Sequence, residues 1–96
     1  FDCSGYVCWV YNQNGYDIGR TTANGLWQKS QHISEAEAKP GDLVFFSGTY
    51  DTPGMSHTGI YLGNGMMVSA GDPIKYANIH SSYWESHLAG FGRLSK

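Results

Sequence analysis

The chain has 96 residues, a net charge of −2 and no run of basic residues. A chain of this length forms a single domain with a modest core. The charge pattern argues against nucleic acid and anionic membrane surfaces as partners. Because no apolar stretch approaches the roughly 20 residues of a spanning helix, no membrane span is expected either.

The first predicted element is a helix from Cys3 to about Asn14. Asp2 is a suitable N-cap, Gly15 is the residue expected just beyond the C-terminus, and nothing between them breaks a helix. Cys3 then lies in the first turn, where unpaired backbone N–H groups and the positive end of the helix dipole favour a thiolate. Apolar residues recur on the same stripe as the thiol. We therefore expect this stripe to pack on a sheet and to place the sulfur at its edge.

Two shorter helical elements and a strand follow. Thr22 can cap a second helix that runs to about Lys29, with Leu26 facing inward. Ser34 begins a capping-box pattern that leaves room for a single turn before the next proline, and the carboxylates of that turn are expected to be solvated. The apolar run at residues 43–46 predicts a strand that is buried on both faces.

The second half of the chain has the pattern of consecutive strands. Residues 57–62 and 66–70 predict the clearest hairpin, joined around the Gly-Asn-Gly sequence at 63–65. Beyond it we expect a strand, a turn or short helix, and a closing strand, at residues 74–79, 81–87 and 91–94. A helix followed by short consecutive strands predicts an α+β domain with a largely antiparallel sheet.

A cysteine and a histidine supply the candidate chemistry. A cysteine peptidase needs a thiolate, a base that pairs with it, a group that orients the base, and donors for the oxyanion. Cys3 would supply the sulfur, and the first-turn N–H groups would be the donors. His57 is the best base, because it begins a strand after a loop that can reach the helix end. Cys8 is expected to be a small buried hydrophobe rather than a disulfide partner.

The other histidines are weaker candidates. His32 lies in a polar segment predicted to be a loop and His87 lies in a late polar turn, so both are expected to be solvated. A zinc site made of Cys3, His57 and His80 has no HExxH or CxxC spacing to support it. We therefore expect no metal and no cofactor.

Three sequence blocks carry a resemblance to a known family. They are Asp-Cys-Ser-Gly at 2–5, Pro-Gly-Asp-Leu-Val-Phe-Phe at 40–46 and Ser-His-Thr-Gly-Ile-Tyr-Leu-Gly-Asn-Gly at 56–65. In order, type and separation they resemble the NlpC/P60 family of cell-wall cysteine peptidases, over nearly the whole chain. The resemblance implies a papain-like α+β fold, in which the N-terminal helix that bears the nucleophile packs on a small antiparallel sheet.

The resemblance also implies an activity. Family members hydrolyse peptidoglycan stem peptides, usually at the bond between γ-linked D-glutamate and the L-diamino acid. By this resemblance Cys3 attacks the carbonyl as a thiolate, and His57 acts as general acid and base. Asp2, Ser4 and Ser56 are the expected substrate-binding residues.

The residue that orients the base is where the sequence departs from the family. Members commonly place His, Asn or Gln twelve residues past the base, and that position is Ser69 here. An odd-length hairpin loop puts Ser69 opposite Gly59 and on the same face as His57. A two-residue turn instead pairs Asp72 with His57. We favour Ser69, acting directly or through a water, over Asp72 or His80; impaired catalysis is the remaining alternative.

Other residues of the same blocks are assigned structural roles. Asp42 resembles the acidic residue of the family's Pro-Gly-Asp block, and we expect it to cap the turn and fix the start of the following strand. Gly59 offers a small residue at which the N-terminal helix could approach closely. Three aromatic residues are expected to be core or groove wall: Tyr6, Trp9 and Trp84.

The organisation of the whole protein follows from where the chain starts. Because the chain opens directly on the predicted helix, we interpret residues 1–96 as an N-terminally incomplete domain of a longer, multidomain protein. Its second half is similar to the CwlT-type cell-wall hydrolases of conjugative elements. That similarity implies a lysozyme-like domain upstream and a secreted or cell-surface location in the bacterial wall.

Two other classes of function stay open at this point. One is a catalytically weak or inert peptidoglycan-binding module. The other is an amidase or acyltransferase that uses the same Cys–His pair on another acyl donor.

Overall fold

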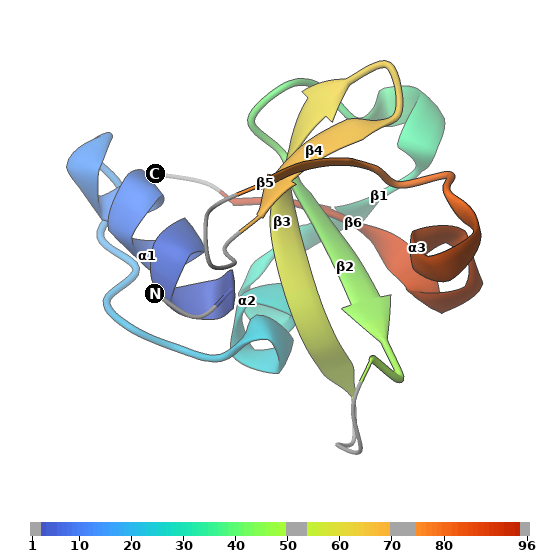
Figure 1. Ribbon diagram of the computed structural model, residues 1–96. Coiled ribbons are helices and arrows are strands. Elements are labelled where there is room, and N and C mark those ends of the chain that lie inside the picture. The colour runs from blue at the N-terminus through green and yellow to red at the C-terminus, as the bar shows by residue number, and fades with distance from the viewer. Residues whose placement is uncertain (1–2, 50–53, 70–74, 95–96) are drawn as a thin grey trace.

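The computed structural model describes residues 3–49, 54–69 and 75–94. In chain order the elements are α1 (Cys3–Gln13), α2 (Ala23–Lys29), β1 (Gln31–Ile33), η1 (Glu35–Glu37), β2 (Leu43–Ser47), β3 (Met55–Gly63), β4 (Met66–Ser69), β5 (Lys75–Asn78), α3 (Ser82–His87) and β6 (Leu88–Arg93). Within these residues six strands form one antiparallel sheet in the order β1-β6-β2-β3-β4-β5, with α1 and α2 packed on one side and α3 on the other (Figure 1). This is the α+β architecture that the sequence predicts.

Helix α1 ends as its sequence predicts. Gly15 follows it with a φ of 88°, a left-handed conformation that glycine adopts without steric cost. The N–H of Tyr16 donates to the carbonyl of Tyr11 at 3.1 Å, and the two rings meet edge to face with centroids 4.7 Å apart. This Schellman-type cap and its apolar contact stop the helix and turn the chain back. The predicted N-cap, Asp2, lies outside the described residues.

The short elements after α1 are stabilised by local caps. Thr22 Oγ1 accepts a hydrogen bond from the N–H of Gly25 at 3.0 Å at the start of α2, and Leu26 of that helix is fully buried. In η1, Ser34 and Glu37 exchange side-chain and backbone hydrogen bonds that complete a capping box. The predicted second helix and the predicted single turn are both confirmed.

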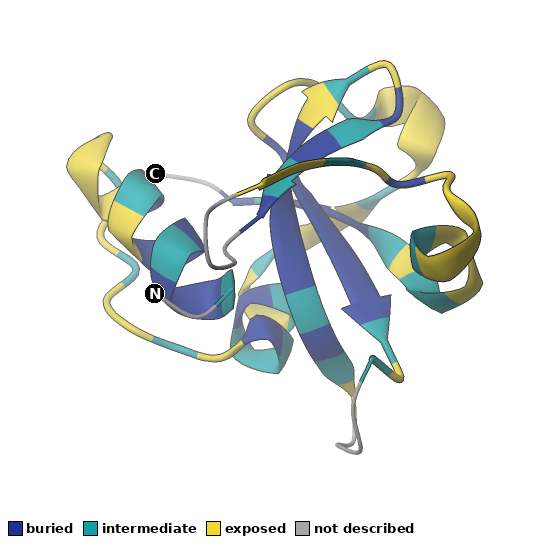
Figure 2. Ribbon diagram, in the orientation of Figure 1, coloured by how far each residue is buried: buried dark blue, intermediate teal, exposed yellow. Residues whose placement is uncertain are grey.

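Strand β2 has a core on each of its faces. Leu43 and Phe45 pack into a cluster with side chains of α1 and α2, whereas Val44 and Phe46 pack into a second cluster on the opposite face. All four side chains are fully buried, which confirms the strand predicted to be buried on both faces. Figure 2 shows the burial as dark blue along β2 and much of β3.

The hairpin of β3 and β4 closes through a two-residue turn. Asn64 and Gly65 have φ angles of 54° and 76°, and two consecutive positive φ angles are the signature of a type I′ turn. Gly63 pairs with Met66 on either side of the turn. The N–H of Gly65 also donates to the hydroxyl of Tyr61 at 3.1 Å, so the turn is tied to the buried part of its own strand.

The sheet contains an edge strand in a segment that was predicted to be a loop. The three residues of β1 pair with β6, for example Ile33 with Phe91. His32, predicted to be solvated, stacks on Trp27 with 3.5 Å between the ring centroids. Its Nε2 donates to the Trp27 carbonyl at 3.0 Å. The loop prediction was wrong because pairing with β6, rather than the polar local sequence, creates this strand.

Candidate active site

Cys3, the candidate nucleophile, lies on the first turn of α1. Cys3 is half-buried and is the first residue of the helix. The next residue, Ser4, is buried, and its Oγ accepts a hydrogen bond from the Arg20 guanidinium at 3.2 Å. Arg20 also donates to the carbonyl of Thr21 at 2.7 Å. The loop that follows α1 therefore returns to the helix end that carries the candidate nucleophile.

His57 lies on β3, and its ring points to the face of the sheet that carries α3, whereas α1 packs on the opposite face against residues such as Ile60. Its ring is half-buried between two other rings, Phe46 of β2 at 5.8 Å and Trp84 of α3 at 4.9 Å between centroids. His57 Nε2 is buried and has no hydrogen-bond partner among the described residues. Burial lowers the pKa of this imidazole, because a low-dielectric surrounding disfavours the charged form.

Ser69 lies on the same face of the sheet as His57. Tyr61 pairs with Met67, and the same register, continued by two residues along each strand, puts Ser69 opposite Gly59. A Cβ placed on Gly59 would be 3.4 Å from the Cβ of Ser69, which agrees with this register. The side chain of Ser69 is thus a diagonal neighbour of His57 across the strand pair.

A β-bulge produces this register. The turn has two residues, the case in which a regular ladder would pair Asp72 with His57, but the register shifts between Tyr61 and Gly63. The extra residue, Leu62, restores the pairing that an odd-length loop would give. Asp72 itself lies outside the described residues.

Gly59 gives room to β4 rather than to the helix. A Cβ at this position would lie 2.8 Å from Met67 Sδ and 3.1 Å from the Val68 carbonyl oxygen. Gly59 also shares the face of β3 that carries His57, whereas Ile60 packs with the side chains of α1. The expectation that the helix approaches at Gly59 was wrong for this reason.

Ser56 is held within the protein by its preceding loop. Only 2% of the residue is exposed. Its Oγ accepts a hydrogen bond from the Thr49 N–H at 3.0 Å and lies 2.6 Å from the Thr49 hydroxyl. The neighbouring Met55 N–H donates to Asn24 Oδ1 at 3.1 Å. These bonds fix the start of β3, and the substrate contact expected for Ser56 stays a prediction.

His80, an alternative candidate for the residue that orients His57, faces a different set of groups. Its Nε2 donates to Glu35 Oε2 at 2.6 Å, and its Nδ1 lies 3.6 Å from Glu85 Oε1. The hydrogen bond to Glu35 raises the pKa of His80. His80 is therefore not the partner of His57 Nε2. His87, expected to be solvated, donates from Nδ1 to the Ser47 carbonyl at 3.0 Å.

Asp42 has the structural role that was predicted. One carboxylate oxygen accepts from the N–H of Lys39 at 2.8 Å, which closes the turn before β2. Arg93 donates to both carboxylate oxygens, at 3.0 and 2.8 Å. Burial acts to raise the pKa of Asp42, but these hydrogen bonds outweigh it and hold the pKa below its usual range. The carboxylate joins the turn to the last strand.

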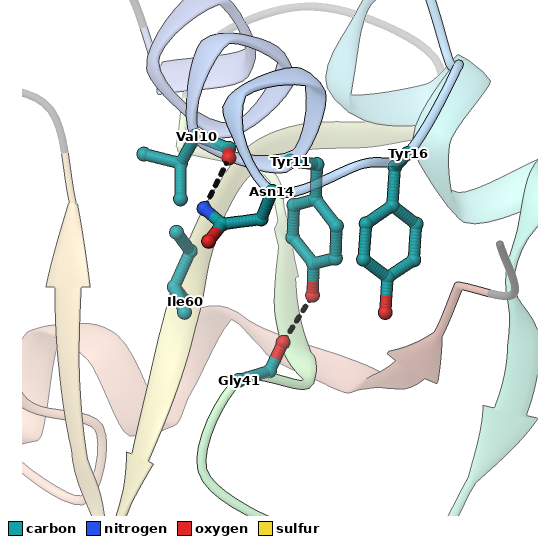
Figure 3. Close-up of a pocket in the computed structure, with 6 residues that line it drawn as sticks. All are labelled: Val10, Tyr11, Asn14, Tyr16, Gly41 and Ile60. Atoms are coloured by element: carbon teal, nitrogen blue, oxygen red, sulfur yellow. Dashed lines mark hydrogen bonds between the residues drawn. The ribbon is translucent and has the colours of Figure 1, made fainter.

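A small apolar pocket lies at the other end of α1 from Cys3 (Figure 3). Its volume is about 190 Å³, and it is lined by Val10, Tyr11, Asn14, Tyr16, Gly41 and Ile60. The hydroxyl of Tyr11 donates to the carbonyl of Gly41, and Asn14 donates to the carbonyl of Val10. The Tyr11 hydroxyl and the Asn14 amide are therefore bonded within the protein, and neither Cys3 nor His57 lines this pocket.

The described residues contain neither a metal cluster nor a membrane-spanning helix. No group of three or more His, Cys, Asp or Glu side chains is placed to hold a metal ion. None of the described helices is both long and apolar enough to cross a bilayer. Cys8 is a buried thiol that shares no disulfide with Cys3, as its position on the helix predicts.

Two residues near the candidate site residues belong to no recognisable sequence motif. Trp84, predicted only as core or groove wall, covers His57, and Arg20, which drew no prediction, reaches Ser4. Both contacts are made between distant segments of the chain. A lone basic residue after a helix and a tryptophan in a polar turn carry no local pattern that would reveal such contacts.

Comparison with known proteins places this arrangement in a family. The model of the NlpC/P60 family matches residues 1–93. The chain is 50% identical over 95 residues to the "probable endopeptidase p60" of Listeria monocytogenes, covering 98% of this chain and 19% of that protein. It is 46% identical to the "bifunctional muramidase/DL-endopeptidase CwlT" of Bacillus subtilis, covering 98% of this chain and 29% of CwlT.

Solved structures agree with these matches. A protein similar to a lipoprotein of the NLP/P60 family, from Staphylococcus aureus, has a TM-score of 0.94 at 41% identity and covers 100% of this chain and 32% of that one. RipD from Mycobacterium tuberculosis, a non-catalytic NlpC/p60 domain protein, shares the fold with a TM-score of 0.79 at 23% identity, over 99% of this chain and 67% of RipD. The chain spans less than a third of each of the two sequence relatives. On the family match over nearly its whole length, the chain belongs to the NlpC/P60 family.

Proposed function

We propose that this domain is a cysteine endopeptidase that cleaves peptidoglycan stem peptides at the bond between γ-linked D-glutamate and the L-diamino acid. The observation that carries the proposal is the match of the NlpC/P60 family model to residues 1–93, together with a cysteine at the start of a helix. Cys3 occupies the first turn of α1, and half-buried His57 lies on β3, whose other face packs against α1; among the described residues His57 Nε2 has no hydrogen-bond partner. The proposed chemistry requires the Cys3 thiol and the His57 imidazole, which come from different elements, to meet within hydrogen-bond reach.

The mechanism starts from a neutral imidazole, which burial of His57 favours. His57 takes the proton of the Cys3 thiol as the sulfur attacks the carbonyl carbon, and backbone N–H groups of the first turn of α1 stabilise the oxyanion. The tetrahedral intermediate then collapses, the C–N bond breaks, and the imidazolium gives its proton to the leaving amine. A water molecule, deprotonated by His57, finally hydrolyses the thioester and releases Cys3.

The names of the sequence relatives support the choice of substrate and bond. The p60 protein is named an endopeptidase and CwlT a DL-endopeptidase with a muramidase activity. A secreted or cell-surface location and a lysozyme-like domain upstream fit the same relatives and are part of this proposal.

Digestion of defined muropeptides by the intact protein tests the proposal. We expect fragments cut between D-glutamate and the diamino acid, identified by mass spectrometry, and no such fragments with Cys3→Ala or His57→Ala. Cys8→Ala is the matched control, because it removes the other thiol of the same helix, which is buried away from the site. Products that persist in Cys3→Ala, or cuts at another bond only, would contradict the proposal.

A non-catalytic peptidoglycan-binding module is the second candidate. Ser69 takes the place of the orienting side chain and is not bonded to His57 Nε2, and RipD shows that the fold is compatible with loss of catalysis. This candidate predicts that the intact protein sediments with sacculi and yields no Cys3-dependent product. Rapid alkylation of Cys3 by iodoacetamide at neutral pH would favour the peptidase, because it indicates thiolate character.

A further inference from the structure

Three aromatic rings from three elements enclose the candidate base. Phe46 of β2 is the register partner of His57 on β3. Trp84 of α3 lies over both, with ring centroids 4.8 Å from Phe46 and 4.9 Å from His57. The imidazole and the indole planes are inclined by 31°, which is close to an offset stack. The histidine ring is thus packed on a phenyl ring and covered by an indole.

The described contacts of His57 are ring–ring contacts, and none of them is a hydrogen bond to its Nε2. That nitrogen is buried and has no hydrogen-bond partner among the described residues. Ser69 shares the face of the sheet with His57, but as a diagonal neighbour it has a side chain too short to span the roughly 7–8 Å between such positions. Rotation about the Cβ–Cγ bond is soft for an imidazole. The rings of Phe46 and Trp84 are therefore the groups placed to restrict it.

Helix α3 is anchored independently of its contact with His57. It has six residues, too few to be stable alone. Its last residue, His87, donates to the Ser47 carbonyl at 3.0 Å, and Glu85 lies 3.6 Å from His80. The following residue, Leu88, begins β6 and pairs with Phe46. These contacts fix the backbone of α3, so shortening the side chain of Trp84 is expected to leave the helix in place.

We propose that Trp84 is a positioning residue for His57: its indole holds the imidazole in the orientation that a polar third residue would otherwise set. This inference rests on the proposed peptidase function. Trp84 touches neither substrate nor thiol in this role. It replaces a directional hydrogen bond by ring packing and by the exclusion of water from Nε2.

The role has an electrostatic signature that a purely structural role would lack. Removing the indole lets water reach the imidazole, so the lowered pKa of His57 rises toward its usual value of about 6.5. Few titratable groups of neighbouring elements can confuse this readout. β2 and β4 carry none, Glu85 and His87 of α3 are engaged by His80 and Ser47, Tyr83 packs edge to face on Trp84, and α1 packs on the opposite face of the sheet.

The test compares Trp84→Ala, Trp84→Phe and Tyr83→Ala in the intact protein. For Trp84→Ala we expect kcat on muropeptides to fall by about ten- to a hundredfold, because a misplaced catalytic group costs on that order, with a much smaller change in KM. The pKa of His57 by NMR and the acid limb of the pH profile should both move up. Trp84→Phe should keep most of the wild-type kcat and most of the lowering of the His57 pKa, since an aromatic ring remains. Tyr83 is 53% exposed and contacts Trp84 rather than His57, so Tyr83→Ala should change neither.

A second substitution separates positioning from folding. Ser69→Asn offers Nε2 a polar partner, so Trp84→Ala should cost clearly less in that background than in the wild type. An equal cost in both backgrounds, or an unchanged His57 pKa in Trp84→Ala, would overturn the proposal. The NMR readout needs no turnover. If the wild type yields no Cys3-dependent product, the proposed function fails while the ring contact is still tested.

Discussion

Ser69 lies opposite Gly59 and faces the same side of the sheet as His57, yet neither it nor any other described residue forms a hydrogen bond with His57 Nε2. We expect Ser69→Asn to raise kcat by about tenfold or more. A hydrogen bond to a group that becomes charged is worth roughly 1.5–3 kcal/mol, and the imidazole is charged in the step that follows thiol attack. Ser69→Ala should change kcat by less than about threefold. Muropeptide turnover followed by mass spectrometry measures both variants, and a large loss in Ser69→Ala would show that the serine itself orients the base.

The two histidines His57 and His80 are expected to titrate on opposite sides of about 6.5. Burial lowers the pKa of His57, whereas the hydrogen bond to Glu35 raises that of His80. By linkage, the folded state loses stability as the pH falls from about 6.5 toward the lowered pKa of His57. The stability contributed by protonated His80 is present below about 6.5 and is lost as the pH rises through its raised pKa.

Titration of the imidazole Hε1 signals by NMR checks both directions. Glu35→Gln is the control, since it should bring the pKa of His80 down and leave that of His57 unchanged. Two titrations that both centre near 6.5 would show that neither environment is as the structure describes.

The Asp42–Arg93 pair is expected to matter for stability and not for turnover. Asp42→Asn removes a carboxylate that accepts two hydrogen bonds from Arg93, at a cost of about 2 kcal/mol in the free energy of unfolding. Asp17→Asn, at an exposed position, is the matched control and should change little. Urea unfolding measures the difference, and kcat per folded molecule should stay within about twofold.

The effect of Asp42 also has a pH dependence of known sign. Its pKa is lowered in the folded state, so its stabilisation is present above about 3.9 and is lost as the pH falls through the folded pKa. The difference between wild type and Asp42→Asn should therefore shrink in acid. If the stability difference between the two proteins stayed constant down to pH 2, the charge of Asp42 would not be the source of the stabilisation.

Gly59→Ala is expected to destabilise the hairpin by about 1–3 kcal/mol, the usual cost of overpacking. The new methyl group would meet Met67 Sδ at 2.8 Å and the Val68 carbonyl oxygen at 3.1 Å. Because the sulfur is flexible and the carbonyl is not, β4 has to shift, and Ser69 moves with it. Thermal unfolding measures the loss. The double variant Gly59→Ala/Met67→Ala should be less destabilised than the sum of its single variants, and strict additivity would count against the contact.

Local signals in the sequence accounted for the parts of the fold that local interactions create. Three elements were predicted because the hydrogen bonds that begin or end them lie within a few residues. Their signals are the cap at Thr22, the capping box at Ser34 and the glycine after α1. Strand β1 was not predicted because its strand partner is β6, some sixty residues away in the chain. Its polar residues have no pattern of their own to indicate a strand.

The candidate site was likewise predictable only where local sequence patterns define it. The cysteine at a helix start and the histidine at a strand start are visible as local patterns with a known chemistry. The face on which Ser69 lies depended on the bulge at Leu62, which no periodicity reveals because the turn alone indicates the opposite register. The cover of His57 by Trp84 is a tertiary contact between β3 and α3, and its energy appears only once both elements are folded.

The brevity of α3 has a consequence for how this domain tolerates insertions and deletions. Adding or removing one residue between Ser81 and Trp84 would turn the helical side chains by about 100°, since an α-helix has 3.6 residues per turn. Tyr83 or Glu85 would then take the place of the indole above the histidine. The number of residues from Ser81 to Leu88 is therefore as much a constraint on the site as the identity of any one of them, although this segment contributes neither the thiol nor the base.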